Sequence, residues 1–443
     1  PAQINVPRDF WTQVIDIELP PIVRFERQGG GKDAVDRAAK LLSEAKFPVI
    51  LSGAGVVIGD AIDDCKKLAE KLDAPVCNGY QHNDSFPGSH PLAVGPLGYN
   101  GSKAAMELIS KADVVLALGT RLNPFSTLPG YGIDYWPKDA TIIQVDMNPD
   151  RIGLTKKVTV GICGDAKMVA QQILEKLSSN AGDNGREDRK NLIHQTKSAW
   201  LQTLTSLDHE DDDPGTVWNK EARERDKDRM SPRQAWRAIQ AGMPEDVIIS
   251  SDIGNNCAIG NAYPTFEKPR KYLAPGLFGP CGYGFPSILG AKIGCPDTPV
   301  IGFAGDGAFG ISMNEMSSCA REEWPAITMV IFRNYQWGAE KRNSILWFDD
   351  NFVGTELDPE LSYAKVANAC GLKGVIANTM EETTKAIKQS CEDQKKGITT
   401  FIEIILNQEL GEPFRRDAMK KPVKVAGISK SDMKPQKSLV SWD

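Results

Sequence analysis

The sequence predicts an α/β fold made of two doubly wound parallel-sheet domains joined by a charged linker. In residues 28–177, and again in residues 231–410, short apolar runs alternate with segments of helical periodicity. Apolar strands between helices are typical of a parallel sheet covered on both faces. Residues 178–230 break this alternation with the acidic run Asp208–Asp213 and the mixed-charge run Lys220–Arg229. Acidic runs are most often solvated, so we interpret this stretch as a linker with one or two exposed helices.

The composition is that of an ordinary globular protein. The 443 residues are 41% hydrophobic and 25% charged, which is enough apolar material for two or three domain cores. A net charge of −6 without a basic stripe argues against a nucleic-acid partner, and no apolar run approaches the length of a membrane span. The nine cysteines are scattered, without metal-ligand spacing. Unpaired thiols favour a reducing compartment, and we expect a cytoplasmic protein.

The first domain is predicted from strands that alternate with helices. Amphipathic helices are expected at Asp33–Glu44 and Asp60–Leu72, and buried strands at Pro48–Ser52, Asp113–Leu118 and Ala140–Val145. Gly53-Ala54-Gly55 follows a strand and could belong to a nucleotide site. The spacing to Gly59 does not match GxGxxG, and Asp146 lies far beyond the expected acidic position. We therefore favour a structural turn.

The second domain contains a strand–helix–strand unit in residues 299–338. The apolar runs Pro299–Ala304 and Ala326–Phe332 flank a segment in which Met313, Met316 and Ala320 share one helical face. The two strands are expected to be parallel, with a right-handed crossover. Their carboxyl ends then lie at one edge of the sheet, where α/β proteins bind ligands.

Asp306 follows the first of these strands and Asn334 the second, so we expect the two side chains to lie close together. A carboxylate, an amide oxygen and a main-chain carbonyl are hard ligands that suit Mg²⁺, with phosphate oxygens completing the coordination. Gly305 and Gly307 would let the backbone approach a diphosphate, and a helix beginning near Phe309 would present free N–H groups. The alternative is a tight turn in which Asp306 caps a helix, but the two strand ends together favour the metal site.

Two further segments are expected at the same edge. The strand Val247–Ser250 ends before Gly254-Asn255-Asn256, and a glycine-rich turn with Gly279 and Gly282 leads into a helix. Together with Asp306–Ala308, these segments predict an anion-binding cleft. The domain is completed by helices at Pro232–Gln240, Leu361–Cys370 and Met380–Cys391 and by a buried strand at Thr400–Leu406.

At these residues the chain resembles a known family. GDGAF at Gly305–Phe309, Asn314-Glu315 in the helix, Trp324-Pro325 before a strand and then Asn334 look like the diphosphate-binding signature of thiamine diphosphate enzymes. The acetolactate synthase-like branch is most similar, and within it RNYQWGAEKRN at Arg333–Asn343 looks most like the sulfoacetaldehyde acetyltransferases. The resemblance covers nearly the whole chain. Many relatives show two asparagines where this chain has Arg333-Asn334, so only Asn334 is expected to serve as a ligand.

The resemblance implies roles for the residues of the cleft. Asp306, Asn334 and the carbonyl of Gln336 would hold Mg²⁺. Thiamine diphosphate would be contacted by Gly254, Asn255, Asn256, Gly279, Cys281, Gly305, Asp306, Gly307, Ala308 and Asn334. Cys281 would take the place of the bulky apolar residue, often Met, that props the cofactor into its bent shape, and this role is favoured over that of a nucleophile. The family's central domain, here residues 28–177, binds flavin in some members; no FAD is expected here, because no flavin motif is recognisable.

The implied activity is that of an acyltransferase. Sulfoacetaldehyde and phosphate would give acetyl phosphate and sulfite, as in taurine and sulfonate degradation, with the cofactor as electron sink. These small-molecule substrates are anions, and candidates to hold them are Lys341, Arg342, Arg415 and Arg416; solvated cations are the alternative. An acetolactate synthase or 2-oxoacid decarboxylase-like enzyme of the same branch, or a non-catalytic cofactor-binding chain, are the other possibilities.

The resemblance also suggests what the two ends are. Residues 1–27 would be a remnant of the family's N-terminal pyrimidine-binding domain with a connector, and residues 411–443 a basic C-terminal tail. In the family, the glutamate that activates the cofactor belongs to that first domain. The catalytic residue is therefore unknown here, and we expect this chain alone to be inactive. Because the family places the cofactor between subunits, a homodimer or homotetramer is expected.

Overall fold

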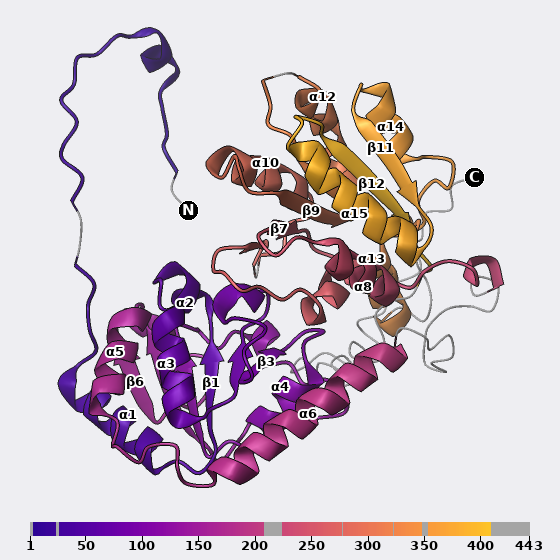
Figure 1. The fold of residues 1–443 in the computed structure, drawn as a ribbon. Coiled ribbons are helices and arrows are strands. Elements are labelled where there is room, and N and C mark those ends of the chain that lie inside the picture. The colour runs from indigo at the N-terminus through magenta and orange to yellow at the C-terminus, as the bar shows by residue number, and fades with distance from the viewer. Residues whose placement is uncertain are drawn as a thin grey trace, which may run out of the picture.

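The structure is a computed structural model that describes residues 3–23, 26–207, 224–276, 278–321, 323–347 and 353–408. Two α/β domains contain most of these residues (Figure 1), and each is built on a six-stranded parallel sheet. The predicted fold class is thus confirmed. The acidic run Asp208–Asp213 and the tail 411–443, with Arg415 and Arg416, lie outside the described residues.

The first sheet has the strand order β3-β2-β1-β4-β5-β6. Its strands are β1 (Pro48–Ser52), β2 (Val76–Asn78), β3 (Ala93–Pro96), β4 (Val114–Leu118), β5 (Thr141–Asp146) and β6 (Val160–Cys163). Helices α1 (Lys32–Glu44), α3 (Ile62–Leu72) and α5 (Ala166–Lys176) pack together, and α2 (Ala54–Ile58) follows β1 directly. All side chains of β1 and β4 are buried, as their uninterrupted apolar sequences predict.

A long helix, α6 (Arg186–Leu207), packs against α4 (Lys103–Ile109) of the first domain. Its Trp200 and Leu204 form a small buried cluster with Ala104. Near its start, the buried Arg189 guanidinium donates hydrogen bonds to five backbone carbonyls, those of Lys46, Leu72, Asp73, Gly182 and Asn184. Part of the stretch interpreted as a linker therefore packs on the first domain, and the boundary at residue 177 stays a prediction.

The second sheet has the strand order β11-β12-β10-β9-β7-β8. Its strands are β7 (Ile248–Ser251), β8 (Tyr272–Leu273), β9 (Val300–Gly305), β10 (Thr328–Arg333), β11 (Lys373–Ala377) and β12 (Thr400–Ile405). Its helices are α8 (Pro232–Gly242), α9 (Asn255–Ile259), α10 (Gly284–Gly294), α11 (Asp306–Ser312), α12 (Met316–Cys319), α13 (Gly338–Trp347), α14 (Tyr363–Ala369) and α15 (Met380–Gln394). In the core, the Trp236 ring of α8 lies 4.8 Å from the Phe303 ring and 5.4 Å from the Phe332 ring, between centroids.

The segment after β9 differs from the prediction of one helix. It consists of α11, a 3₁₀ turn at Met313–Glu315 and α12, and α11 begins at Asp306 rather than near Phe309. Met316 is buried, whereas Ala320 is exposed. The predicted single helical face was wrong here because the 3₁₀ turn changes the residue period from 3.6 to 3 and rotates the face that meets the core.

Polar contacts connect the two domains. The Asn83 amide donates to the Asn261 carbonyl at 2.9 Å. The Asp84 carboxylate accepts from the N–H groups of Lys271 and Tyr272, at 2.9 and 3.2 Å. Because all of these polar groups are buried or partly buried, their hydrogen bonds fix how the loop after β2 sits on the second domain.

Residues 3–23 stand away from both domains (Figure 1). Their side chains are exposed, including apolar ones such as Val14 and Ile22. Their assignment to a further domain stays a prediction. Among the residues that the structure describes, no helix is long and apolar enough to cross a membrane.

Candidate functional site

Strand ends and one glycine-rich turn of the second domain surround a single cavity of about 150 Å³. Strands β7, β9 and β10 are neighbours, and their register places Ser251 beside Phe303 and Gly305 beside Phe332. The segments that follow these strands therefore meet at one edge, as predicted. The cavity is lined by Ile253, Gly254, Asn255, Asn256, Cys257, Gly279, Cys281, Gly305, Asp306, Gly307, Ala308, Asn334, Gln336, Trp337, Gly338, Ala339 and Glu340. Every residue predicted from the sequence to contact the cofactor or the metal is among them.

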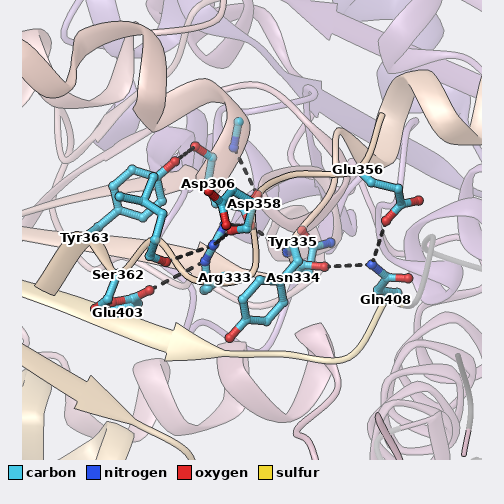
Figure 2. Close-up of polar contacts among 12 residues, drawn as sticks. Asp306, Arg333, Asn334, Tyr335, Glu356, Asp358, Ser362, Tyr363, Glu403 and Gln408 are labelled. Atoms are coloured by element: carbon cyan, nitrogen blue, oxygen red, sulfur yellow. Dashed lines mark hydrogen bonds and ion pairs between the residues drawn. The ribbon is translucent and has the colours of Figure 1, made fainter. Parts of the chain in front are cut away.

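Asp306 is buried at the start of α11 with both carboxylate oxygens engaged (Figure 2). Oδ1 accepts the N–H of Gly307 at 2.9 Å, and Oδ2 accepts the N–H of Tyr335 at 2.6 Å. Oδ2 also accepts Nη1 of Arg333 at 3.1 Å. Burial raises the pKa of Asp306 to about 6, although Arg333 and these hydrogen bonds act in the opposite direction. Since each carboxylate oxygen has about two acceptor sites, Oδ1 retains one for a ligand.

Three residues with side-chain amides, Asn256, Asn334 and Gln336, line the same cavity. Asn334 is 2% exposed, and its backbone carbonyl accepts from Nε2 of Gln408 at 3.2 Å. Oε1 of Gln336 and Oδ1 of Asn256 are buried and make no hydrogen bond within the described part of the chain. Leaving a buried acceptor unsatisfied costs about 1–3 kcal/mol, so a cation or a bound polar group fits this wall of the cavity. Among the described residues no cluster of three His, Cys, Asp or Glu side chains could hold a metal, which leaves carboxylate plus amide and carbonyl oxygens as the donor set, the set that Mg²⁺ accepts.

Three glycines line this cavity at positions where a side chain would enter free space, clash with a neighbour or strain the backbone. A Cβ atom on Gly305 would meet no atom within 4 Å and would project into free space. A Cβ atom on Gly307 would lie 2.7 Å from the indole ring of Trp337. Gly254 adopts a φ of 121°, which side-chain-bearing residues avoid. The backbone at these positions can therefore approach a diphosphate more closely than any other residue type would allow.

Asp252 connects the end of β7 to the glycine-rich turn. Its carboxylate accepts the N–H of Gly282 at 3.2 Å and that of Gly284 at 2.7 Å. Burial raises the pKa of Asp252. Cys281 lies in the same turn, and burial raises its pKa to about 11, with a further contribution from Asp252. The thiol is therefore protonated near neutral pH, as suits a packing group rather than a nucleophile.

The sequence reasoning missed cavity residues beyond Asn334. Trp337 and Glu340 line the cavity together with the backbone of Gly338 and Ala339. The N–H of Trp337 donates to the Thr355 carbonyl at 2.7 Å, which holds this segment in place. The sequence did contain this information, because residues that directly follow the proposed metal ligand Asn334 must pass close to it.

Of the four cations proposed for anion binding, the structure describes Lys341 and Arg342. Lys341 forms an ion pair with Glu356, and Arg342 is fully buried. Neither is among the described residues that line the cavity. Arg415 and Arg416 lie outside the described residues.

The first domain has a second cavity, of about 600 Å³, at the ends of β1 and β4. Gly55 lies in its wall, and Gly53 precedes it at the end of β1. A Cβ atom on Gly53 would lie 2.5 Å from the Gly119 carbonyl, and one on Gly55 would lie 2.7 Å from the Gly119 Cα. These glycines are required for the close approach of two turns, which agrees with the structural interpretation. That this domain binds no FAD stays a prediction.

A buried carboxylate, amide groups and open glycine backbone at one edge of a parallel sheet are features that suit a diphosphate group and a divalent cation. The comparisons with known proteins agree with this class. Residues 35–173 match the family described as thiamine pyrophosphate enzyme, central domain, and residues 252–404 match its C-terminal TPP binding domain.

Curated relatives extend the similarity over almost the whole chain. A probable sulfoacetaldehyde acetyltransferase from Rhizobium meliloti is 77% identical, over 99% of this chain and 74% of its own length. The sulfoacetaldehyde acetyltransferase of Roseovarius nubinhibens is 74% identical, over 98% of this chain and 72% of its own. The chain therefore belongs to the thiamine pyrophosphate enzymes, in the group of the sulfoacetaldehyde acetyltransferases, and is an acyltransferase.

A solved structure supports the fold. Benzoylformate decarboxylase from Polynucleobacter necessarius superposes with a TM-score of 0.67 at 20% identity, over 91% of this chain and 69% of its own. At this identity the likeness concerns the arrangement of the two domains only.

Proposed function

We propose that this protein converts sulfoacetaldehyde and phosphate to acetyl phosphate and sulfite. The observation that carries the proposal is the 77% identity over 99% of the chain to a relative named for this activity. The reaction is redox-neutral: the aldehyde carbon is oxidised to the acyl level while the neighbouring carbon is reduced to a methyl group as sulfite leaves. No external oxidant is needed, which supports the expectation that FAD is absent. The setting would be the degradation of taurine and other sulfonates.

In this proposal Mg²⁺ is held by Asp306, Asn334 and the carbonyl of Gln336. Thiamine diphosphate, when bound, would supply a carbon nucleophile and an electron sink. Gly254, Asn255 and Asn256 orient the diphosphate from the end of β7, and Gly305, Gly307 and Ala308 orient it from β9. Cys281 supports the rest of the cofactor from the turn that Asp252 holds. The volume of about 150 Å³ suits the diphosphate and its cation, not a whole ligand of several hundred Å³.

The test measures sulfite and acetyl phosphate in parallel. Joined to the family's N-terminal pyrimidine-binding domain, the protein is expected to release both in equal amounts from sulfoacetaldehyde, and only when phosphate, thiamine diphosphate and Mg²⁺ are present together. The 443-residue chain alone is expected to release neither. Asp306→Ala should abolish cofactor retention and turnover while the protein still folds, with a lower unfolding temperature because the buried Arg333 loses one partner. An Asp306→Ala variant that binds the cofactor as tightly as the parent would show that the metal lies elsewhere.

An acetolactate synthase-like activity is the second candidate, because a probable acetolactate synthase large subunit of Methanococcus aeolicus is 28% identical over 88% of this chain. The two activities differ in the leaving group. Incubation with pyruvate alone should release no carbon dioxide if the first proposal holds, whereas carbon dioxide release without sulfite release from sulfoacetaldehyde would favour the second.

We also propose an oligomer, at least a homodimer. Phe278 and Ile311 support this, since they are 92% and 57% exposed beside the glycine-rich turn. Apolar side chains at the rim of a ligand site are candidates for cover by another subunit or domain. Sedimentation of the active enzyme gives the test, and a fully active monomer would rule the proposal out.

Location in the cytoplasm is supported by the nine cysteines, all of which are free. Fractionation of cells that express the protein tests it.

A further inference from the structure

Arg333 directly precedes the proposed ligand Asn334, and it is buried against the carboxylate of Asp306. The Arg333 side chain is 0% exposed and that of Asp306 is 1% exposed. The guanidinium lies between two aromatic rings, 4.1 Å from the centroid of Tyr335 and 5.4 Å from that of Tyr363. A fixed positive charge thus lies next to a carboxylate that, in our proposed function, must attract a divalent cation.

A second buried carboxylate lies on the other side of this guanidinium (Figure 2). Glu403 of β12 is 2% exposed, and its Oε1 lies 3.6 Å from Nε of Arg333. In the sheet register Glu403 is paired with Ile331, so Arg333 is its diagonal neighbour on the same face of β10. Glu403 is a charged residue within an otherwise apolar buried strand, and a buried charge is retained only when it is paired.

The remaining contacts fix the geometry of this group. Oε2 of Glu403 accepts Ser362 Oγ at 2.6 Å and the N–H of Ala364 at 3.0 Å, which orients its carboxylate. Nη2 of Arg333 donates to the carbonyls of Asp358 and Leu361. Both Nη atoms are therefore held by hydrogen bonds, whereas Nε makes none within the described part of the chain and faces Glu403 as an ion pair.

The charges of Asp306, Arg333 and Glu403 together leave one negative charge, the same as an isolated aspartate. We propose that Glu403 is a positioning residue for the metal site: it holds Arg333 in place and offsets its charge, so that Asp306 still attracts a divalent cation. This inference rests on the metal site of the proposed function. It assigns a role to a residue on a strand that contributes nothing to the described cavity lining.

The test measures cation affinity directly, with Mn²⁺ as the probe in the presence of thiamine diphosphate, by the electron paramagnetic resonance signal of free Mn²⁺. Glu403→Gln keeps the shape but leaves the group neutral overall, and we expect Mn²⁺ to bind about ten- to a hundredfold more weakly, as for other residues that orient metal ligands. Glu403→Asp keeps the charge and should restore most of the affinity. Glu360→Gln is the matched control, because it removes an exposed carboxylate from the same region and should leave the affinity unchanged.

The double variant Arg333→Gln with Glu403→Gln separates charge from structure. It returns the site to one negative charge, and the introduced amide can still donate to Asp306, so Mn²⁺ affinity should return to within about threefold of the parent. A merely structural role for Glu403 would instead lower the unfolding temperature without this rescue. The double variant leaves no buried charge of this group unpaired except that of Asp306. If Glu403→Gln does not fold, the Mn²⁺ affinity of the double variant is compared directly with that of the parent.

Two results overturn the inference: Glu403→Gln binding Mn²⁺ as well as the parent, or a double variant that folds and binds much more weakly than the parent. A parent protein that binds no Mn²⁺ with the cofactor present refutes the proposed function and this inference together. If the parent binds Mn²⁺ and Glu403→Gln binds it with the same affinity, only the inference about Glu403 is refuted.

Discussion

Substitution of two nearby glycines by alanine should have different effects. Gly307→Ala should lower the stability of the fold, whereas Gly305→Ala should lower the affinity for the cofactor. In Gly307→Ala the new Cβ would lie 2.7 to 3.0 Å from three ring atoms of Trp337, and the N–H of Trp337 is held by the Thr355 carbonyl. Overpacking of this kind costs about 1–3 kcal/mol. The higher helix propensity of alanine returns up to about 1 kcal/mol, because Gly307 lies in α11. The net expectation is a loss of about 2 kcal/mol in the free energy of unfolding.

In Gly305→Ala the Cβ meets no atom within 4 Å, and the backbone (φ −67°, ψ 157°) is one that alanine adopts freely. Stability should stay within about 0.5 kcal/mol of the parent. The methyl group would however occupy the space proposed for the diphosphate, so the Kd for thiamine diphosphate should rise about tenfold, or ~1.4 kcal/mol. Urea unfolding without cofactor and calorimetric titration with cofactor and Mg²⁺ measure the two effects. A Gly305→Ala variant that binds the cofactor like the parent would refute the placement of the diphosphate, and equal destabilisation by both variants would refute the account of the packing.

Three further predictions address separate parts of the molecule. Burial, with a contribution from Arg121, lowers the pKa of His82 to about 4, so between pH 6.5 and 4 the unfolded chain binds a proton that the folded chain does not. The free energy of unfolding should therefore fall by up to about 3 kcal/mol as the pH is lowered from 6.5 to 4. In urea unfolding His82→Gln should flatten this dependence, and the exposed control His194→Gln should not. Asp252→Ala removes the acceptor of two N–H groups of the glycine-rich turn, and should weaken cofactor binding by at least about tenfold while Asp306 still binds Mn²⁺; unchanged cofactor affinity would contradict the positioning role. Lys341→Ala should raise the KM for one anionic substrate by about ten- to a hundredfold if Lys341 contacts it, and unchanged kinetics for both phosphate and sulfoacetaldehyde would place the anion contacts elsewhere.

The sequence predicted which segments lie together, because parallel-sheet topology places the ends of separate strands at one edge. Asp306, Asn334 and the Gly254–Asn256 segment are far apart in the chain, yet each directly follows a strand, and the structure brings them into one cavity. The fold class could be predicted for the same reason, since strands such as β1 and β4 are apolar throughout.

What could not be predicted depends on contacts that leave no periodic pattern. The 3₁₀ turn at Met313–Glu315 is set by tertiary packing, and the burial of Arg189 of α6 in the first domain is set by five backbone carbonyls that carry no side-chain signal. The cations Lys341 and Arg342 were chosen because they follow the metal loop. Lys341 is paired with Glu356, Arg342 is buried, and neither is among the described residues that line the cavity, so their role in anion binding stays a prediction. Proximity along the chain constrains the backbone of such residues, not the direction of a long side chain.

The contacts of Arg333 illustrate why a buried charge beside a proposed metal ligand needs a partner on another strand. Replacing a neutral asparagine by arginine beside Asp306 would place a positive charge against the incoming cation, and without a partner its burial would cost several kcal/mol. The residue able to offset this charge must lie on a neighbouring strand, on the same face and close to Nε, because the Nη atoms already serve Asp306, Asp358 and Leu361. Glu403 meets all three conditions. Glu403, in the run TFIEIIL, is thus the proposed partner of Arg333, in the run RNYQWG. Chains of this group that have asparagine in place of Arg333 are expected not to require an acidic residue in place of Glu403.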